Sequence, residues 1–473
     1  MNENIRYTDL LGYMDERRDP LISMLRRIVR VPSVRSEPEE HAPFGKACAL
    51  ALVEAGRLYA ENGFETDLHA DSGYLLSYFG GGDKTIGVFS HADVVPVDDK
   101  WTMSDPFSGD VIDGFMFGRG SSDNKCSVIA TILAASAIRD LCHGFSSRIL
   151  MFTGANEESG MADLGNYIRE QPMPDISLVP DSGFPIFRGE KGIMRFYARA
   201  KEPFDRITDF SGGEAVNIIL GQVKAKINVS PDGFDTGFIG DDSRFSVDLS
   251  DGVTVTANGI SKHAAAPDGS LNAAFLMAEK LSECPALTGR DRKTLSDIAS
   301  LKGDYGEGFG IKNDDPDFGP LTIANGIARM KDGRLSLSFD IRYGSSVDSE
   351  VMTETIRNRL DSIGFDFELM HDCRGYVIPK DNPNLQLLMK TYSECTGFPD
   401  DVCCVNGGGT YAKYLKNAFT MGASTDKKQP FTLPPGHGLC HQPDECVPID
   451  GVAEAAAILA YMLIKLDKEG MIA

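Results

Sequence analysis

The chain has 473 residues, of which 42% are hydrophobic and 25% charged, a composition typical of a globular protein. This length exceeds what one hydrophobic core usually holds and predicts two domains. The formal charge of −22 is spread along the chain and excludes nucleic acid as a partner, because binding it requires a basic groove.

The N-terminal segment, MNENIRYTDLLGYMDERRD, is polar and charged, with no apolar core of a signal peptide. No stretch approaches the ~18 apolar residues that predict a membrane span. The ten cysteines lack zinc-finger spacing, which favours reduced thiols over a disulfide framework. We therefore expect a cytoplasmic protein.

Helix and strand patterns alternate in the first part of the chain. Apolar runs at 85–90, 147–153 and 176–179 predict buried strands, and residues 45–62 and 125–141 predict helices. This order indicates an α/β fold with a mainly parallel sheet flanked by helices.

From residue 193 to 388 the strands alternate more cleanly between apolar and polar residues, which is typical of antiparallel sheet. Apolar α/β character then returns and ends in a helix that begins near Asp450. We expect a discontinuous catalytic domain, residues 1–187 and 389–473, with an inserted α+β domain at 188–388.

Polar residues follow the predicted strands of the outer segments. Ligands of doubly wound sheets gather beyond the carboxyl ends of the strands, and nitrogen and oxygen donors there suit one or two zinc or related ions. Any one of these residues alone fits a cap or a satisfied polar group, whereas the set predicts a metal site. Its members are His91, Asp93, Asp123, Glu157, Glu158, Asp181, His437 and His441.

Five motifs appear in a fixed order between residues 85 and 445: SHADVVP, GRGSSDNK, NEESG, PDSGFP and HQPDE. In this order they resemble the M20 family of metallopeptidases. Further segments, SGGEAVN, SKHAAAPDGSLNA, DIR and GGGTYA, resemble its dipeptidase V-like (Xaa-His dipeptidase) branch.

The resemblance implies a centre of two divalent ions, zinc with manganese or cobalt as alternatives. Asp123 would bridge the ions; His91 and Asp181 would complete the ligands of one, and Glu158 and His441 those of the other. HQPDE favours His441 as the last ligand, although His437 lies four residues before it.

The resemblance also implies catalytic roles. Glu157 would be the general base, Asp93 would accept a hydrogen bond from the second ring nitrogen of His91, and His263 would stabilise the oxyanion. A cis peptide follows the bridging aspartate in this family, and Asn124 stands where an aspartate is common, so the cis geometry is left open.

Substrate binding is expected in the inserted domain. In RLSLSFDIRYG the apolar residues alternate, which places Asp340 and Arg342 on the other face of a strand. Arg342 could hold a peptide's terminal carboxylate; a surface ion pair is the alternative. The resemblance adds Asn217, with Gly408, Gly409 and Thr410 on the same carboxylate, where a plain glycine-rich turn is the alternative.

These residues predict hydrolysis of dipeptides or short peptides by a water that two metal ions activate. The nearest alternative is an N-acyl amino acid amidohydrolase, a deacylase or desuccinylase, with the same metal site. A catalytically silent peptide- or metal-binding protein is the third reading. The inserted domain looks doubled beside relatives with a short lid, which favours a monomer whose lid closes on substrate.

Overall fold

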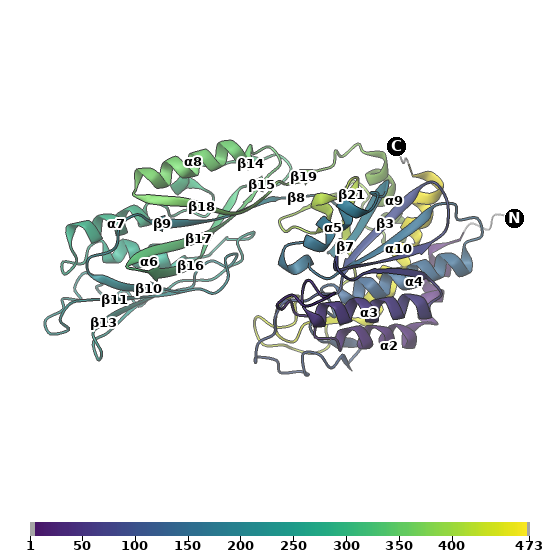
Figure 1. Ribbon diagram of the computed structural model, residues 1–473, viewed down its shortest axis with the longest axis horizontal. Helices are drawn as coiled ribbons and strands as arrows, with labels where there is room; N and C mark the ends of the chain where they lie inside the picture. Colours follow the sequence, from purple (N-terminus) through teal and green to yellow (C-terminus); the bar gives the residue numbers. More distant parts are fainter. Residues whose placement is uncertain (1–4, 471–473) are drawn as a thin grey trace. The chain divides into compact units, whose positions relative to one another are not determined.

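The computed structural model describes residues 5–470, which form two compact units (Figure 1). Unit 1 contains the chain up to Gly189, Ile378–Cys404 and the chain from Thr410. Unit 2 contains Glu190–Val377 and Val405–Gly409. Within residues 5–470, no helix combines the length and the apolar character that crossing a membrane requires.

Unit 1 is built around one mixed sheet, with strands in the order β1-β2-β6-β3-β7-β21-β8. The four central strands β6, β3, β7 and β21 run parallel, whereas β1, β2 and β8 pair antiparallel with their neighbours. A mainly parallel sheet is therefore confirmed. The strands are β1 (Glu65–His69), β2 (Tyr74–Phe79), β3 (Thr85–His91), β6 (Arg148–Gly154), β7 (Ile176–Ser182), β8 (Phe187–Glu190) and β21 (Ala418–Gly422).

Helices and a small sheet complete unit 1. Figure 1 shows its helices packed around the sheet. They are α1 (Tyr7–Asp15), α2 (Arg18–Val29), α3 (Lys46–Glu61), α4 (Lys125–Leu141), α5 (Ala162–Glu170), α9 (Pro383–Thr396) and α10 (Ile449–Glu469), with short turns η1 (Glu157–Ser159) and η3 (Tyr411–Tyr414). A second sheet joins β4 (Asp110–Ile112), β5 (Phe115–Phe117) and β22 (Cys446–Pro448), and β20 (Cys404–Asn406) lies where the chain leaves unit 1.

The central strands of unit 1 direct apolar side chains to both faces of the sheet, so the core has a part on each face. On β6, Ile149 and Met151 join the cluster formed with α3 and α4, whereas Phe152 contacts Tyr167 of α5. Successive side chains of a strand point to opposite faces, so helices cover both. The candidate site lies at the carboxyl ends of the central strands.

Unit 2 contains two four-stranded antiparallel sheets, ordered β16-β17-β9-β18 and β10-β11-β13-β12. Their apolar residues form one shared core with the helices of the unit. The strands of these sheets are β9 (Gly192–Ala200), β10 (Ile207–Ser211), β11 (Gln222–Ile227), β12 (Phe245–Asp248), β13 (Val253–Asn258), β16 (Thr322–Lys331), β17 (Arg334–Tyr343) and β18 (Phe365–Cys373). The helices of the unit are α6 (Ala273–Leu281), α7 (Gly289–Ala299) and α8 (Ser349–Ser362). The unit also contains the short strands β14 (Asp314–Asp315), β15 (Gly319–Pro320) and β19 (Tyr376–Val377) and the turn η2 (Glu307–Phe309).

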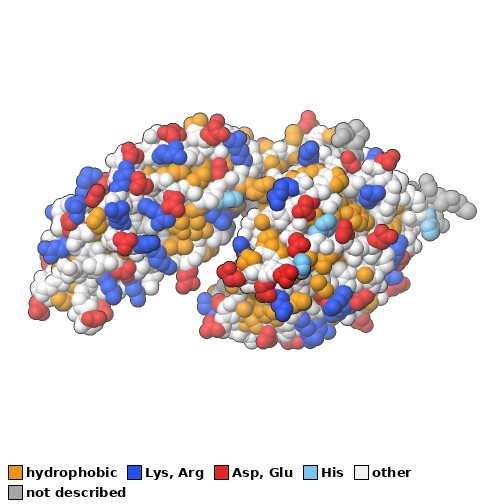
Figure 2. Space-filling model, viewed as in Figure 1, with side chains coloured by type: hydrophobic (Ala, Val, Ile, Leu, Met, Phe, Trp, Pro, Cys, Tyr) orange, Lys and Arg blue, Asp and Glu red, His pale blue; other side chains and the backbone are white. Residues whose placement is uncertain are grey.

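Acidic side chains are dispersed over the surface, as the spread of charge along the sequence predicts. Figure 2 shows Asp and Glu side chains interspersed with Lys and Arg on the visible face of each unit. All ten cysteines are free thiols, and among them Cys440 is exposed.

Candidate metal centre

Three central strands of unit 1 each deliver an acidic or imidazole group to the same edge of the sheet. His91 is the last residue of β3, Asp181 lies near the end of β7, and Glu157 and Glu158 follow β6 in η1. Because β3, β6 and β7 are parallel, their carboxyl ends meet at one edge. Asp123 reaches this edge from the loop before α4, and His441 from the loop before β22.

Asp123 lies between the two histidines and directs one carboxylate oxygen to each. His91 Nε2 is 3.1 Å from Asp123 Oδ1, and His441 Nε2 is 3.1 Å from Asp123 Oδ2. His91 Nε2 is also 3.7 Å from Asp181 Oδ1, and His441 Nε2 is 3.1 Å from Glu158 Oε1. The five predicted metal ligands are thus brought together, with Asp123 at the centre of the set.

Two further candidates, Glu157 and His437, differ in their surroundings. Glu157 offers a carboxylate oxygen within 4.8 Å of donor atoms of His91 and Asp181, so its position is also compatible with metal binding. His437 is directed elsewhere, because its Nδ1 contacts Asp444 Oδ2 at 2.7 Å. The structure therefore groups His441, and not His437, with the acidic residues.

The environment of Asp93 differs from the expected one. The hydrogen-bond acceptor for His91 Nδ1 is the backbone carbonyl of Asp93, at 3.0 Å, while the Asp93 carboxylate lies 3.4 Å from that nitrogen. The carboxylate itself accepts hydrogen bonds from the backbone nitrogens of Glu157, at 3.1 Å, and Glu158, at 3.2 Å. Asp93 thus orients the imidazole mainly through its main chain, and its side chain holds the η1 loop.

The peptide between Asp123 and Asn124 is cis, the geometry that the sequence left open. The Asn124 side chain is buried and fully used: Nδ2 donates to the carbonyl of Pro180 at 2.7 Å and to Asp181 Oδ1 at 2.8 Å, and Oδ1 accepts from the backbone nitrogen of His91 at 3.2 Å. An amide serves here because it donates and accepts at once.

Burial and mutual repulsion raise the pKa values of Glu157, Glu158 and Asp181, whereas at Asp123 burial is outweighed by hydrogen bonds from His441 and His91, which lower its pKa. Burial, together with the charge of Asp181, raises the pKa of Glu157 well above its usual range, and burial beside Asp123 raises that of Glu158 to about 7. Hydrogen bonds to Asp123 and Glu158 raise the pKa of His441 to about 10. Burial opposes ionisation of His91, but Asp181 and Asp123 outweigh it and raise its pKa.

The donor set fits divalent metal ions. Throughout residues 5–470, no lysine or arginine forms an ion pair with Asp123, Glu157, Glu158 or Asp181, so imidazoles are the only groups there that could balance the charge of these four carboxylates. Buried charges of one sign are otherwise paired or bound to metal. Two groups of donor atoms meet within 4.8 Å, His91 with Asp123 and Glu158, and His91 with Glu157 and Asp181.

Unit 2 carries Asn217, His263 and Arg342, which lie in two places. Asn217 and His263 are adjacent: Asn217 Nδ2 lies 3.4 Å from His263 Nε2, and the backbone nitrogen of Ala264 donates to the carbonyl of Asn217. Arg342 on β17 is only 3% exposed and donates through Nε to Asp340 Oδ1 at 2.5 Å. The surface-ion-pair alternative for Arg342 is therefore wrong.

The glycine segment is more constrained than expected. The backbone nitrogen of Gly408 donates to Asn406 Oδ1 at 2.9 Å, and Arg342 Nη1 donates to the carbonyl of Gly407 at 3.2 Å. Thr410 caps η3 by accepting from the backbone nitrogen of Ala412 at 3.2 Å. In this conformation the Gly408 amide and the Thr410 hydroxyl oxygen both take part in hydrogen bonds within the segment.

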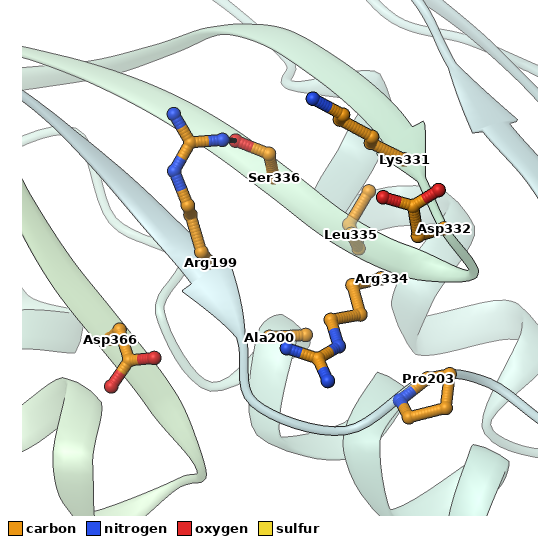
Figure 3. Close-up of a pocket in the computed structure, with 9 residues that line it drawn as sticks. All are labelled: Arg199, Ala200, Pro203, Lys331, Asp332, Arg334, Leu335, Ser336 and Asp366. Carbon is orange, nitrogen blue, oxygen red and sulfur yellow. Dashed lines mark hydrogen bonds between the residues drawn. The ribbon is translucent and has the colours of Figure 1, made fainter.

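A cavity of about 590 Å³ lies in unit 2, and none of the candidate residues lines it (Figure 3). Its wall mixes cationic and acidic side chains, and Figure 3 shows Arg199 hydrogen-bonded to Ser336. The lining residues are Arg199, Ala200, Pro203, Lys331, Asp332, Arg334, Leu335, Ser336 and Asp366.

Sequence reasoning missed the buried groups that hold the site loops. Glu445 accepts hydrogen bonds from the backbone of Asp123, and Asp163 accepts from Ala155, Asn156 and the Tyr411 hydroxyl. Glu445 lies within HQPDE, so its motif gave a signal, whereas no local pattern distinguishes Asp163.

The chain is similar to known dipeptidases in sequence and in fold. The chain is 27% identical to the Beta-Ala-Xaa dipeptidase of Lactobacillus delbrueckii subsp. lactis, over 96% of this chain and 97% of that protein. Its fold resembles human carnosine dipeptidase 1, with a TM-score of 0.63, 15% identity and coverage of 98% and 99%. It also resembles the di-peptidase Dug1p from Saccharomyces cerevisiae, with a TM-score of 0.61, 15% identity and full coverage of both chains. The model of peptidase family M20/M25/M40 matches residues 87–465, and the chain belongs to this family of peptidases.

Proposed function

We propose that the protein hydrolyses dipeptides or similarly short peptides with a free carboxylate, using two divalent metal ions. The observation that carries this proposal is the convergence of His91, Asp123, Glu158, Asp181 and His441 at one edge of the unit 1 sheet. The name of the Lactobacillus relative, a Beta-Ala-Xaa dipeptidase, supports a dipeptide as the substrate class.

The metal ions, zinc with manganese or cobalt as alternatives, would polarise the scissile carbonyl and lower the pKa of the attacking water. Asp123 is suited to hold both ions because each of its oxygens faces a different histidine. His91 and Asp181 would complete one set of ligands, and Glu158 and His441 the other.

Glu157 is the proposed general base. Its side chain is 9% exposed, and its carboxylate accepts no hydrogen bond from any residue between 5 and 470, so it is available to the substrate. The carboxylate would take a proton from the attacking water as the C–O bond forms. It would then give that proton to the amine as the C–N bond breaks.

We assign unit 1 to catalysis and unit 2 to substrate binding. Arg342, oriented by Asp340, has the fork of donors that a terminal carboxylate requires. The neighbouring pair Asn217 and His263 offers polar groups for the scissile carbonyl, with His263 as the proposed oxyanion donor. Gly409 and Thr410 would assist Arg342.

The test combines metal analysis with a panel of dipeptides, measured before and after chelation. We expect hydrolysis that chelation abolishes and that added Zn²⁺, Mn²⁺ or Co²⁺ restores. A comparison of each free-amine dipeptide with its N-acetyl analogue decides the substrate class. Faster hydrolysis of the N-acetyl form would assign the same site to an amidohydrolase, and bound metal without any hydrolysis would assign a binding protein.

We also propose that the protein is a monomer. Unit 2 contains two four-stranded sheets, which supports a doubled substrate-binding domain within one chain. Light scattering on the eluted peak of a sizing column measures the mass directly. A dimer in which a His263→Ala chain regains activity by mixing with a Glu157→Gln chain would contradict this proposal.

A further inference from the structure

The side chain of Glu445 is completely buried and contacts a loop that is more than 300 residues away in the sequence. Its Oε1 accepts hydrogen bonds from three backbone nitrogens, those of Gly120 at 3.1 Å, Ser122 at 2.9 Å and Asp123 at 3.0 Å. Its Oε2 accepts from Arg119 Nη1 at 2.6 Å. Both carboxylate oxygens are therefore used to hold the loop that ends at Asp123.

The two loops are also joined through their main chains. The backbone nitrogen of Gly118 donates to the carbonyl of Glu445 at 2.9 Å, and Arg119 Nη1 donates to the carbonyl of Gln442 at 3.1 Å. Arg119 is 2% exposed, so the pair is a buried ion pair; Arg119 Nη1 bridges Glu445 and Gln442, whereas its Nε has no hydrogen-bond partner among the described residues. Separating the two side chains would leave a buried charge without its partner, which is strongly destabilising.

Each of these two loops carries one candidate ligand of the same metal ion, Asp123 in the first loop and His441 in the second. Asp123 donates its own backbone N–H to Glu445, and His441 lies four residues before Glu445. His441 has a φ of 64°, in the left-handed region that a non-glycine residue rarely adopts, so its loop must be held from outside. The contact between Asp123 Oδ2 and His441 Nε2, at 3.1 Å, therefore depends on how the loops are joined.

We propose that Glu445, held by Arg119, is a positioning residue that sets the Asp123 loop and the His441 loop at the separation required for metal binding. The inference rests on the proposed function only in taking Asp123 and His441 as metal ligands. It predicts an unequal effect on the two ions. The ion of Asp123, Glu158 and His441 depends on both loops, whereas the ion of His91, Asp123 and Asp181 depends on one.

The test is Glu445→Gln, with Co²⁺ as the probe. The amide keeps the size of the side chain, but its NH₂ group cannot accept from Arg119 or from the backbone nitrogens. Calorimetric titration of chelator-treated protein gives affinity and stoichiometry, and the visible spectrum of bound Co²⁺ reports its coordination. We expect Co²⁺ affinity to fall by about 10- to 100-fold, as for other groups that orient metal ligands. We expect this loss at the ion of Asp123, Glu158 and His441, together with a change in the visible spectrum of the Co²⁺ bound there.

Asp467→Asn is the matched control. Asp467 is also a buried carboxylate that accepts several hydrogen bonds, from the backbone nitrogens and hydroxyls of Ser146 and Ser147. These residues precede β6 and lie at the opposite end of that strand from Glu157. The variant should lower the melting temperature and leave Co²⁺ binding unchanged.

Arg119→Lys provides a second test if Glu445→Gln fails to fold. It keeps the positive charge but loses the planar fork, and we expect a smaller loss of affinity at the same ion. Two Co²⁺ ions bound with wild-type affinity and spectrum in either folded variant would overturn the inference. Wild-type protein that binds two Co²⁺ but cleaves no dipeptide would overturn only the proposed function.

Discussion

Asp93 Oδ1 accepts a hydrogen bond from the backbone nitrogen of Glu157 at 3.1 Å, although the two residues are 64 positions apart. Its Oδ2 accepts in the same way from Glu158. The side chain of Asp93 therefore fixes the main chain that carries both glutamates, while its carbonyl fixes the ring of His91.

Asp93→Asn tests this arrangement. The amide presents NH₂ to one of the two backbone N–H groups, and an unsatisfied buried donor costs about 1–3 kcal/mol. We expect a lower melting temperature and at least a tenfold lower kcat because Glu157 moves, measured by calorimetry and dipeptide hydrolysis. Asp67→Asn, at an exposed position of β1, is the control and should change neither quantity. An unchanged kcat in Asp93→Asn would show that the η1 loop does not need this side chain.

Glu157 and Glu158 are adjacent, and their roles can be separated by metal content. Glu157→Gln should lower kcat by about 10²- to 10⁴-fold, the usual contribution of a general base, with metal content unchanged. Glu158→Gln should instead lose metal, because its oxygen lies 3.1 Å from His441 Nε2. Metal analysis of both variants decides the assignment. Loss of metal from Glu157→Gln would exchange the two roles. This outcome is physically open, because Glu157 also lies close to donor atoms of His91 and Asp181.

The sheet and the metal candidates could be predicted because the information is local. An apolar run followed at once by a polar residue marks the end of a buried strand, as at His91, the last residue of β3, and Asp181 in β7. Parallel strands bring such ends together independently of the conformation of the loops. His91, Asp181 and Glu158 could therefore be predicted as a group.

The contacts that hold the site could not be predicted in the same way. Glu445 and Asp123 are 322 positions apart, and Tyr411 and Asp163 are 248 apart. Their hydrogen bonds depend on how distant segments of the chain meet in space, which no periodicity encodes. The Gly408 amide is a smaller example: its capture by Asn406 depends on one side-chain conformation.

Arg342→Lys tests carboxylate recognition in unit 2. Lysine cannot donate two parallel hydrogen bonds, so we expect KM for dipeptides to rise by about 10- to 100-fold with little change in kcat. Dipeptide amides, which lack the terminal carboxylate, should be affected much less. Arg195→Lys is a matched control, because Arg195 Nε also donates to Asp340, at 2.7 Å, from the neighbouring strand β9. Equal rises in KM for the two variants would mean that the Asp340 network supports the fold and does not select the substrate.

Asp163 provides a test by pH. Burial, reinforced by the charge of Asp93, raises the pKa of Asp163 to about 6, above the ordinary value of 3.8 for an aspartate. Between these values the folded protein keeps a proton that the unfolded chain has lost, so this group's contribution to stability falls as pH rises through the interval.

We therefore expect the free energy of unfolding of the wild type, relative to Asp163→Asn, to fall between pH 4 and pH 6. The fall should reach up to about 3 kcal/mol, since each pKa unit corresponds to about 1.4 kcal/mol. Above pH 7 the difference should be constant, because Asp163 is then ionised in both states. Urea titrations of chelator-treated protein measure it, followed by the fluorescence of Trp101, the single tryptophan, which lies in unit 1. A wild-type curve that runs parallel to that of Asp163→Asn from pH 4 to pH 7 would contradict the raised pKa.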